Sequence, residues 1–131
     1  MRKKHDRTLM TEVELEFMTV VWELGQGSVR DILAELNKVQ ERAYTSVATV
    51  LKIMEQKGFL TSSRIDRSLV YQPAIPKADY QQKTLRDLSS KLFNGTPTAL
   101  VARLVDDENI TDDMLEEMRA LLNERLGDNA S

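Results

Sequence analysis

The chain has 131 residues, of which 41% are hydrophobic and 30% charged, a composition ordinary for a soluble globular protein. It has no cysteine and a single histidine, His5, which excludes disulfides, thiolate metal sites and Ser-His-Asp or Cys-His catalysis in a folded pocket. Its apolar runs are too short to span a bilayer, and no apolar segment follows the basic N-terminus as in a secretory signal. We therefore expect a cytoplasmic protein without a metal or cofactor.

Basic residues gather in one part of the chain, although the formal net charge is −3. Residues 1–72 hold 11 Lys and Arg against 10 Asp and Glu, whereas residues 73–131 hold 7 against 11. Within residues 37–67 the basic residues outnumber the acidic ones by six to three. This local excess indicates a surface for nucleic acid, and the acidic half indicates partner binding or oligomerisation.

The first two predicted helices are recognised by their starting residues. Thr11 and Glu14 have the spacing of a capping box, so a helix begins there, after a flexible basic tail over residues 1–10. Apolar residues recur at helical spacing until Gly25, and Ser28 can cap a second helix. The apolar stripe of that second helix is Val29, Ile32, Leu33 and Leu36.

A third helix is predicted over residues 44–57, followed by a β-hairpin. Gly58 suits the left-handed position beyond a helix end, and strands are predicted at Phe59-Leu60 and at residues 69–71, around a basic tip. The inner face of the helix is Val47, Val50, Leu51 and Met54. Its outer face is Thr45, Ser46, Ala48, Thr49 and Lys52.

This order of elements is typical of a winged helix-turn-helix, a mainly α fold with a small β-hairpin wing. A hydroxyl-rich helix suits the major groove of DNA, and a basic hairpin suits the phosphate backbone. Ser and Thr are not strong helix formers, so their concentration on an exposed face favours a functional role over a merely solvated surface. We predict a DNA-binding domain over residues 11–75. The alternative is a winged-helix protein-interaction module that does not bind DNA.

Residues 76–131 are predicted to form helices only. One runs from about Asp79 to Asn94, the next opens at Thr96-Pro97, and the last is capped by Thr111 and stops at Gly127. So small a layer of helices cannot bury much surface alone, and a two-fold homodimer is the commonest solution. The residues predicted to form a dimerisation surface are Leu85, Leu88, Leu92, Leu100, Leu104, Leu115, Met118 and Leu122.

Six segments, in order, resemble a known family over about residues 10–126. They are MTEVELEFMTVVWELG, SVRDILAELN, YTSVATVLKIMEQKGFL, VYQPAIP, LFNGTPTALVARLV and ITDDMLEEMRALLNERL. Together they are similar to the penicillinase repressor (BlaI/MecI/CopY) family of bacterial winged-helix repressors. The resemblance implies a homodimer that binds pseudo-palindromic operators with TACA/TGTA-like half-sites. The DNA-contacting residues that it and the helix pattern imply are Arg42, Tyr44, Thr45, Ser46, Thr49, Lys52, Arg64 and Arg67.

The chain departs from this family at named positions. Asp66 replaces the wing-tip glycine that precedes arginine in many members, and Ala48 replaces an arginine of the β-lactam branch, so the operator sequence can differ. Where those members are cleaved at an Asn-Phe step, this chain has Arg103-Leu104. The absence of cysteine excludes thiolate copper sensing of the kind implied by the copper branch.

We therefore predict a transcriptional repressor and not an enzyme, with double-stranded operator DNA and a second copy of the chain as its partners. No sensor domain and no cysteine switch are recognisable in the sequence. Proteolysis, a small molecule in the dimer interface and a protein partner all remain open as the inducing signal.

Overall fold

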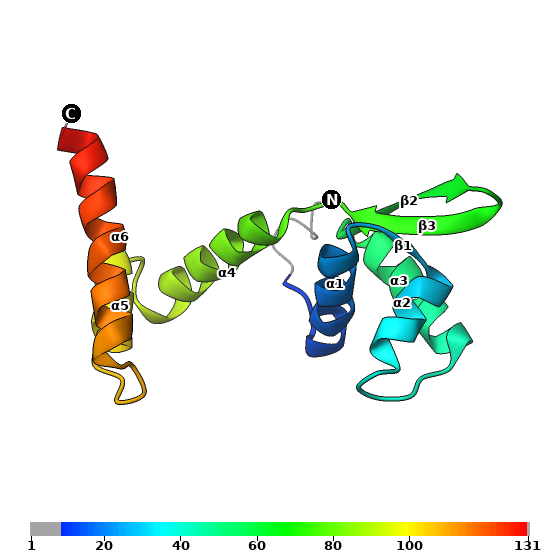
Figure 1. Ribbon diagram of the computed structural model, residues 1–131, viewed down its shortest axis with the longest axis horizontal. Coiled ribbons are helices and arrows are strands. Elements are labelled where there is room, and N and C mark those ends of the chain that lie inside the picture. Colours follow the sequence, from blue (N-terminus) through cyan, green and yellow to red (C-terminus); the bar gives the residue numbers. More distant parts are fainter. Residues whose placement is uncertain (1–8, 131) are drawn as a thin grey trace. The chain divides into compact units, whose positions relative to one another are not determined.

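The computed structural model describes residues 9–130, and the chain divides into two compact units, Met1–Thr84 and Leu85–Ser131. The predicted tail of residues 1–10 lies outside the described residues up to residue 8. The first unit contains α1 (Glu12–Leu24), β1 (Gly27–Ser28), α2 (Val29–Leu36), α3 (Tyr44–Gln56), β2 (Leu60–Ile65) and β3 (Ser68–Pro73) (Figure 1). Helix α4 (Lys77–Leu92) begins in it, and the second unit holds the rest of α4 with α5 (Pro97–Val105) and α6 (Asp112–Ala130).

Reciprocal side-chain caps start the first two helices, as predicted. The Thr11 hydroxyl accepts from the Glu14 backbone N–H at 3.1 Å, and the Glu14 carboxylate accepts from the Thr11 backbone N–H at 2.9 Å. Ser28 and Asp31 form the same box at the start of α2. Each box satisfies two backbone donors that a helix start otherwise leaves unpaired. Gly58, just after α3, has φ of +92°, the left-handed conformation predicted for it.

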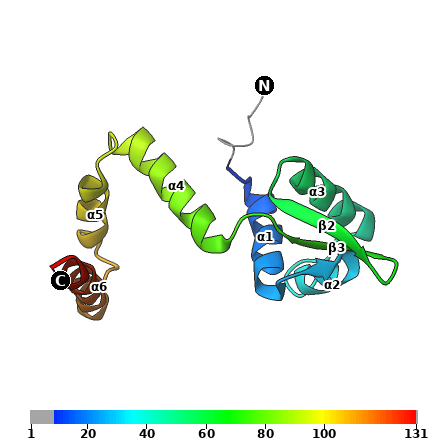
Figure 2. The ribbon, with the colours of Figure 1, turned by 90° about the horizontal axis from the view of Figure 1, so that it is seen from above.

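The hydrophobic core joins the three helices to the inner face of the wing. Each of α1, α2 and α3 contributes three buried apolar side chains, spaced three or four residues apart, and the segment from Phe59 to Tyr71 adds the remainder. Val50, expected in this core, is only half-buried at its edge. Figure 2 shows the strands of the hairpin together with α2 and α3, and the hairpin loop extending past the ends of both helices.

The sheet has three strands, and the expectation of two was incomplete. The two-residue strand β1 pairs antiparallel with β3, with Gly27 opposite Tyr71 and Ser28 opposite Val70, so the strand order is β1-β3-β2. A strand this short shows no hydrophobic alternation in the sequence. Its pairing depends on β3, which lies more than forty positions along the chain.

The wing turn contains two residues, because Ile65 pairs with Ser68 across it. Asp66 has φ of 51° and Arg67 has φ of 72°, so both take the left-handed conformation of a type I′ hairpin turn. Aspartate is among the non-glycine residues that most readily adopt this conformation. The tight turn is therefore present without the glycine that the resemblance implied at position 66.

The first unit extends to Thr84, past the boundary expected after residue 75, because Tyr80 belongs to its core. The Tyr80 ring lies 6.0 Å from the Trp22 ring and 6.4 Å from the Phe59 ring, measured between centroids. Its hydroxyl accepts from the Met10 backbone N–H at 2.7 Å. The Trp22 Nε1–H donates to the Ile75 carbonyl at 2.9 Å, which fixes the segment leading into α4.

The second unit has little interior of its own. Every buried hydrophobic side chain of the described residues lies between Phe17 and Tyr80, and α5 and α6 share few contacts. Helix α6 continues through Gly127 to Ala130, so the stop expected at that glycine was wrong. Glycine weakens a helix by only about 1 kcal/mol, and this one does not end it. No helix within residues 9–130 combines the length and apolarity needed to cross a bilayer.

An ion pair ties α1 to the end of α3 and makes stability depend on pH. Glu14 is buried, and its carboxylate accepts from Lys57 Nζ at 2.6 Å. Burial raises the pKa of the Glu14 carboxyl, but the bonds from Lys57 and Thr11 outweigh this and leave its pKa below the usual 4.5. A lowered folded-state pKa stabilises the protein above the unfolded pKa, and this stabilisation is lost as pH falls from about 5 through the folded pKa.

Replacing Lys57 with methionine is expected to lower the free energy of unfolding at pH 7 by about 1–3 kcal/mol, because a buried carboxylate loses its charged partner. Urea unfolding at pH 7 and pH 4 measures the effect, which should shrink at the lower pH, where Glu14 begins to be protonated. Lys52→Met, at an exposed position of the same helix, is the control. Equal losses in the two variants at pH 7 would contradict a specific role of the pair.

Candidate nucleic-acid interface

Helix α3 divides into a buried face and a hydroxyl-bearing exposed face, as its sequence predicted. Val47, Leu51 and Met54 are completely buried. The hydroxyl of Thr49 donates to the Thr45 carbonyl at 2.9 Å, so its oxygen faces solvent as an acceptor. The exposed face offers short hydrogen-bonding groups that can approach base edges closely. Its residues are Thr45, Ser46, Thr49 and Lys52, whereas Ala48 is half-buried.

The start of α3 is open toward solvent. Its N-cap is Ala43, which provides no side-chain cap, in contrast to the boxes that start α1 and α2. The backbone N–H groups of a first turn without such a cap can bind an anionic oxygen. Tyr44, the first residue of the helix, is 45% exposed, and the guanidinium of Arg30 lies 5.5 Å from the centroid of its ring.

Arg42 is placed differently from the other predicted contacts. Its side chain is only 16% exposed, and its Nη2 donates to Glu16 at 2.8 Å. The guanidinium also lies 5.2 Å from the centroid of the Phe17 ring, and the backbone N–H donates to the Asn37 side chain at 2.9 Å. These contacts anchor the turn between α2 and α3 to α1, so the geometry assigns Arg42 a structural role.

The wing is joined to α3 and carries two exposed arginines. The Ser62 hydroxyl donates to Glu55 at 2.7 Å, which ties β2 to the outer side of α3. Arg64 and Arg67 are exposed near the turn, and Arg64 Nη1 lies 3.4 Å from the Arg67 carbonyl oxygen. Between the wing and the starts of α2 and α3 is a cleft of about 280 Å³. Its lining residues are Ser28, Val29, Arg30, Tyr44, Arg64, Arg67, Ser68 and Leu69.

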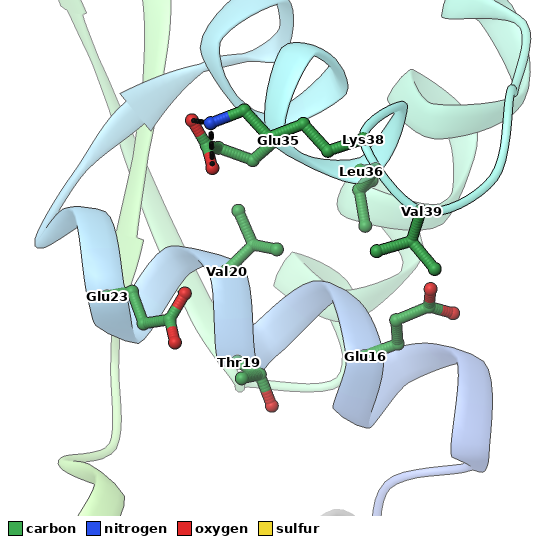
Figure 3. A pocket seen from close by; sticks show the side chains of 8 residues that line it. All are labelled: Glu16, Thr19, Val20, Glu23, Glu35, Leu36, Lys38 and Val39. Carbon is green, nitrogen blue, oxygen red and sulfur yellow. Dashed lines mark hydrogen bonds and ion pairs between the residues drawn. The ribbon is translucent and has the colours of Figure 1, made fainter.

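A second hollow, of about 410 Å³, lies between α1 and the end of α2 (Figure 3). Val20 points from α1 toward Leu36 and Val39, and carboxylates stand around this apolar floor. Two of those carboxylates are paired, Glu16 with Arg42 and Glu35 with Lys38 at 3.1 Å. The hollow is therefore apolar with a largely neutralised rim, and unlike the basic cleft it has no attraction for a polyanion.

The part of the chain that the structure describes contains no group of three or more His, Cys, Asp or Glu side chains able to hold a metal ion. A winged helix with an exposed polar helix face beside a basic cleft is a geometry for binding, in which positioned side chains contact DNA without chemistry.

Residues 10–124 match the family model described as penicillinase repressor. The chain belongs to the penicillinase repressor family. This confirms the resemblance inferred from the six sequence segments, and with it a DNA-binding transcriptional repressor that is not an enzyme. The family model begins at the residue whose backbone contacts Tyr80 and ends within α6, so it includes both units.

Curated relatives of this penicillinase repressor family member match it over most of their length. The methicillin resistance regulatory protein MecI of Staphylococcus aureus is 24% identical over 116 residues, which are 88% of this chain and 94% of that protein. The penicillinase repressor of Bacillus licheniformis is 24% identical over 115 residues, or 88% and 90%. A MarR family protein of Bacillus stearothermophilus, 14% identical with a TM-score of 0.50, covers 96% of this chain and 79% of its own, and shows likeness of fold alone.

Arg30 is the residue of this repressor's basic cleft that sequence reasoning missed. It follows the α2 cap by two positions, beside Asp31, and in sequence it resembles an ordinary solvated helix residue. Only the fold brings α2 alongside the first residue of α3 and the wing. The available signal was weak: an arginine in the first turn of a helix, where the macrodipole disfavours positive charge.

Proposed function

We propose that this protein represses transcription as a homodimer by binding a pseudo-palindromic operator and thereby occluding a promoter. The observation that carries the proposal is the exposed hydroxyl face of α3 next to a cleft lined by three arginines and no carboxylate. The relatives named above, a penicillinase repressor and a resistance regulatory protein, support the same function.

In this proposal α3 enters the major groove and the wing follows the backbone. Thr45, Ser46 and Thr49 contact base edges or phosphates, and the oxygen of Thr49 accepts from an exocyclic amino group. Lys52 contacts a phosphate, as does the wing through Arg64 and Arg67. Tyr44 stands at the point where the helix enters the groove. Arg42 supports this surface from below, through its bonds to α1, and does not contact DNA.

The C-terminal helices form the dimer in this proposal, with residues 11–84 as the DNA-binding domain and the rest as the dimerisation domain. Five of the eight predicted dimerisation residues are exposed in the single chain, and Leu92 and Leu122 are exposed by 67% and 60%. The other three, Leu100, Leu115 and Met118, are half-buried. Uncovered leucines on a unit without its own core favour association through this surface. The exposed five are Leu85, Leu88, Leu92, Leu104 and Leu122.

Selection of bound duplexes from a random DNA pool at moderate salt tests the function. We expect an enriched palindrome whose half-sites are about one helical turn apart, the spacing at which a symmetric dimer presents two recognition helices. Enrichment of a single half-site would contradict dimeric binding. Recovery of unselected sequence only, or of no DNA, would contradict operator recognition and favour a protein-interaction module.

A further inference from the structure

Three guanidinium groups converge on the cleft without a carboxylate to balance them. Arg30 comes from α2, and Arg64 and Arg67 come from the wing. Among residues 9–130, none of the three has a carboxylate oxygen within 4.0 Å. The nearest acids in sequence stay outside the lining, and the Asp31 carboxylate is occupied by the backbone N–H of Ser28 at 3.0 Å. Such a cluster attracts an anion, which relieves the repulsion among like charges.

The groups around these arginines suit a phosphate. The cleft contains the hydroxyl-bearing residues Ser28, Tyr44 and Ser68, and hydroxyls join arginine among the usual phosphate donors. Its volume of about 280 Å³ compares with about 30 Å³ for one water in the liquid, so a phosphate group enters with part of its hydration shell. Arginine presents a planar fork that matches two phosphate oxygens.

The aromatic ring of Tyr44 positions Arg30. A guanidinium 5.5 Å from a ring centroid is held by the cation–π attraction, while its N–H groups remain free to donate in the ring's plane of approach. Tyr44 begins α3, so it links the position of Arg30 to that of the recognition helix. The wing arginines reach the same cleft across the turn, where Arg64 bonds to the Arg67 carbonyl.

We infer that Arg30, positioned by Tyr44, closes with the wing arginines around one phosphate of the DNA backbone in each half-site. Resting on the proposed function, this adds a contact from α2 that fixes where the wing and α3 lie along the duplex. A phosphate contact carries no direct sequence information, so Arg30 sets the register and the affinity without choosing the bases.

The test is the salt dependence of binding by the full-length Arg30→Gln variant to the palindromic duplex selected above and to a scrambled duplex. We expect the slope of log K against log salt to become shallower by about 0.9 for each half-site bound, and affinity for both duplexes to fall by a similar factor. Arg86→Gln, on an exposed position of α4, removes the same charge outside the cleft and is expected to leave the slope unchanged.

The Tyr44 variants separate positioning from bulk stability. Tyr44→Phe keeps the ring and is expected to retain the wild-type slope, whereas Tyr44→Leu is expected to reduce it as Arg30→Gln does, with an unchanged melting temperature. An unchanged slope in Arg30→Gln, or a loss confined to the selected duplex, would overturn the phosphate contact while leaving operator binding intact. Failure of the wild-type protein to bind either duplex would overturn the proposed function, and this inference with it.

Discussion

Replacing both Thr45 and Thr49 with alanine is expected to abolish the preference for the selected palindrome while leaving weak binding to any duplex. Each lost base contact costs about 1–3 kcal/mol, and a symmetric dimer loses each contact twice. The expected fall in the ratio of specific to non-specific affinity is therefore about 100-fold or more. Competition binding with selected and scrambled duplexes at one fixed salt concentration measures this ratio.

The matched control for this double variant is Thr45→Ser with Thr49→Ser, which keeps both hydroxyl groups. It is expected to keep most of the preference, because the hydrogen-bonding oxygens remain. Both residues are exposed, so neither variant should change the thermal midpoint by more than a few degrees. Undiminished preference in the alanine variant would show that another surface selects the operator sequence.

Replacing Leu92 and Leu122 with glutamate is expected to convert the dimer into monomers. Both side chains are more than half exposed in the single chain, so the change costs the isolated fold little. In a two-fold interface the same change buries four carboxylates, each with a desolvation penalty of several kcal/mol. Sedimentation at micromolar concentration should show a dimer for the wild type and a monomer for the variant, with the dimer dissociation constant raised by about 100-fold or more.

Val39→Glu is the control for charge, because Val39 is 83% exposed and lies in the first unit. It is expected to remain dimeric. The monomeric double variant should also lose affinity for the full palindrome and keep its weaker affinity for one half-site, since avidity requires both recognition helices. A wild-type chain that sediments as a monomer, or a double variant that stays dimeric, would place the interface elsewhere.

Local patterns in the sequence predicted most of the first unit, because each depends on neighbours within a few residues. The capping boxes at Thr11 and Ser28 need only the residue three positions on. The alternation of Val47, Leu51 and Met54 with the exposed hydroxyls of α3 follows from helical periodicity alone. Gly127 shows the limit of such local rules, since the helix continues through it.

The sequence by itself determined the fold class, the family and the face of α3 that meets solvent, because periodicity, caps and ordered motifs are local information. Tertiary structure alone decided which charges are available. It paired Arg42 with Glu16, and it brought Arg30 beside Tyr44 and the wing arginines. It also added β1 to the sheet and Tyr80 to the core. The physical reason is that ion pairing, strand pairing and burial depend on distances between residues far apart in the chain, which linear spacing does not contain.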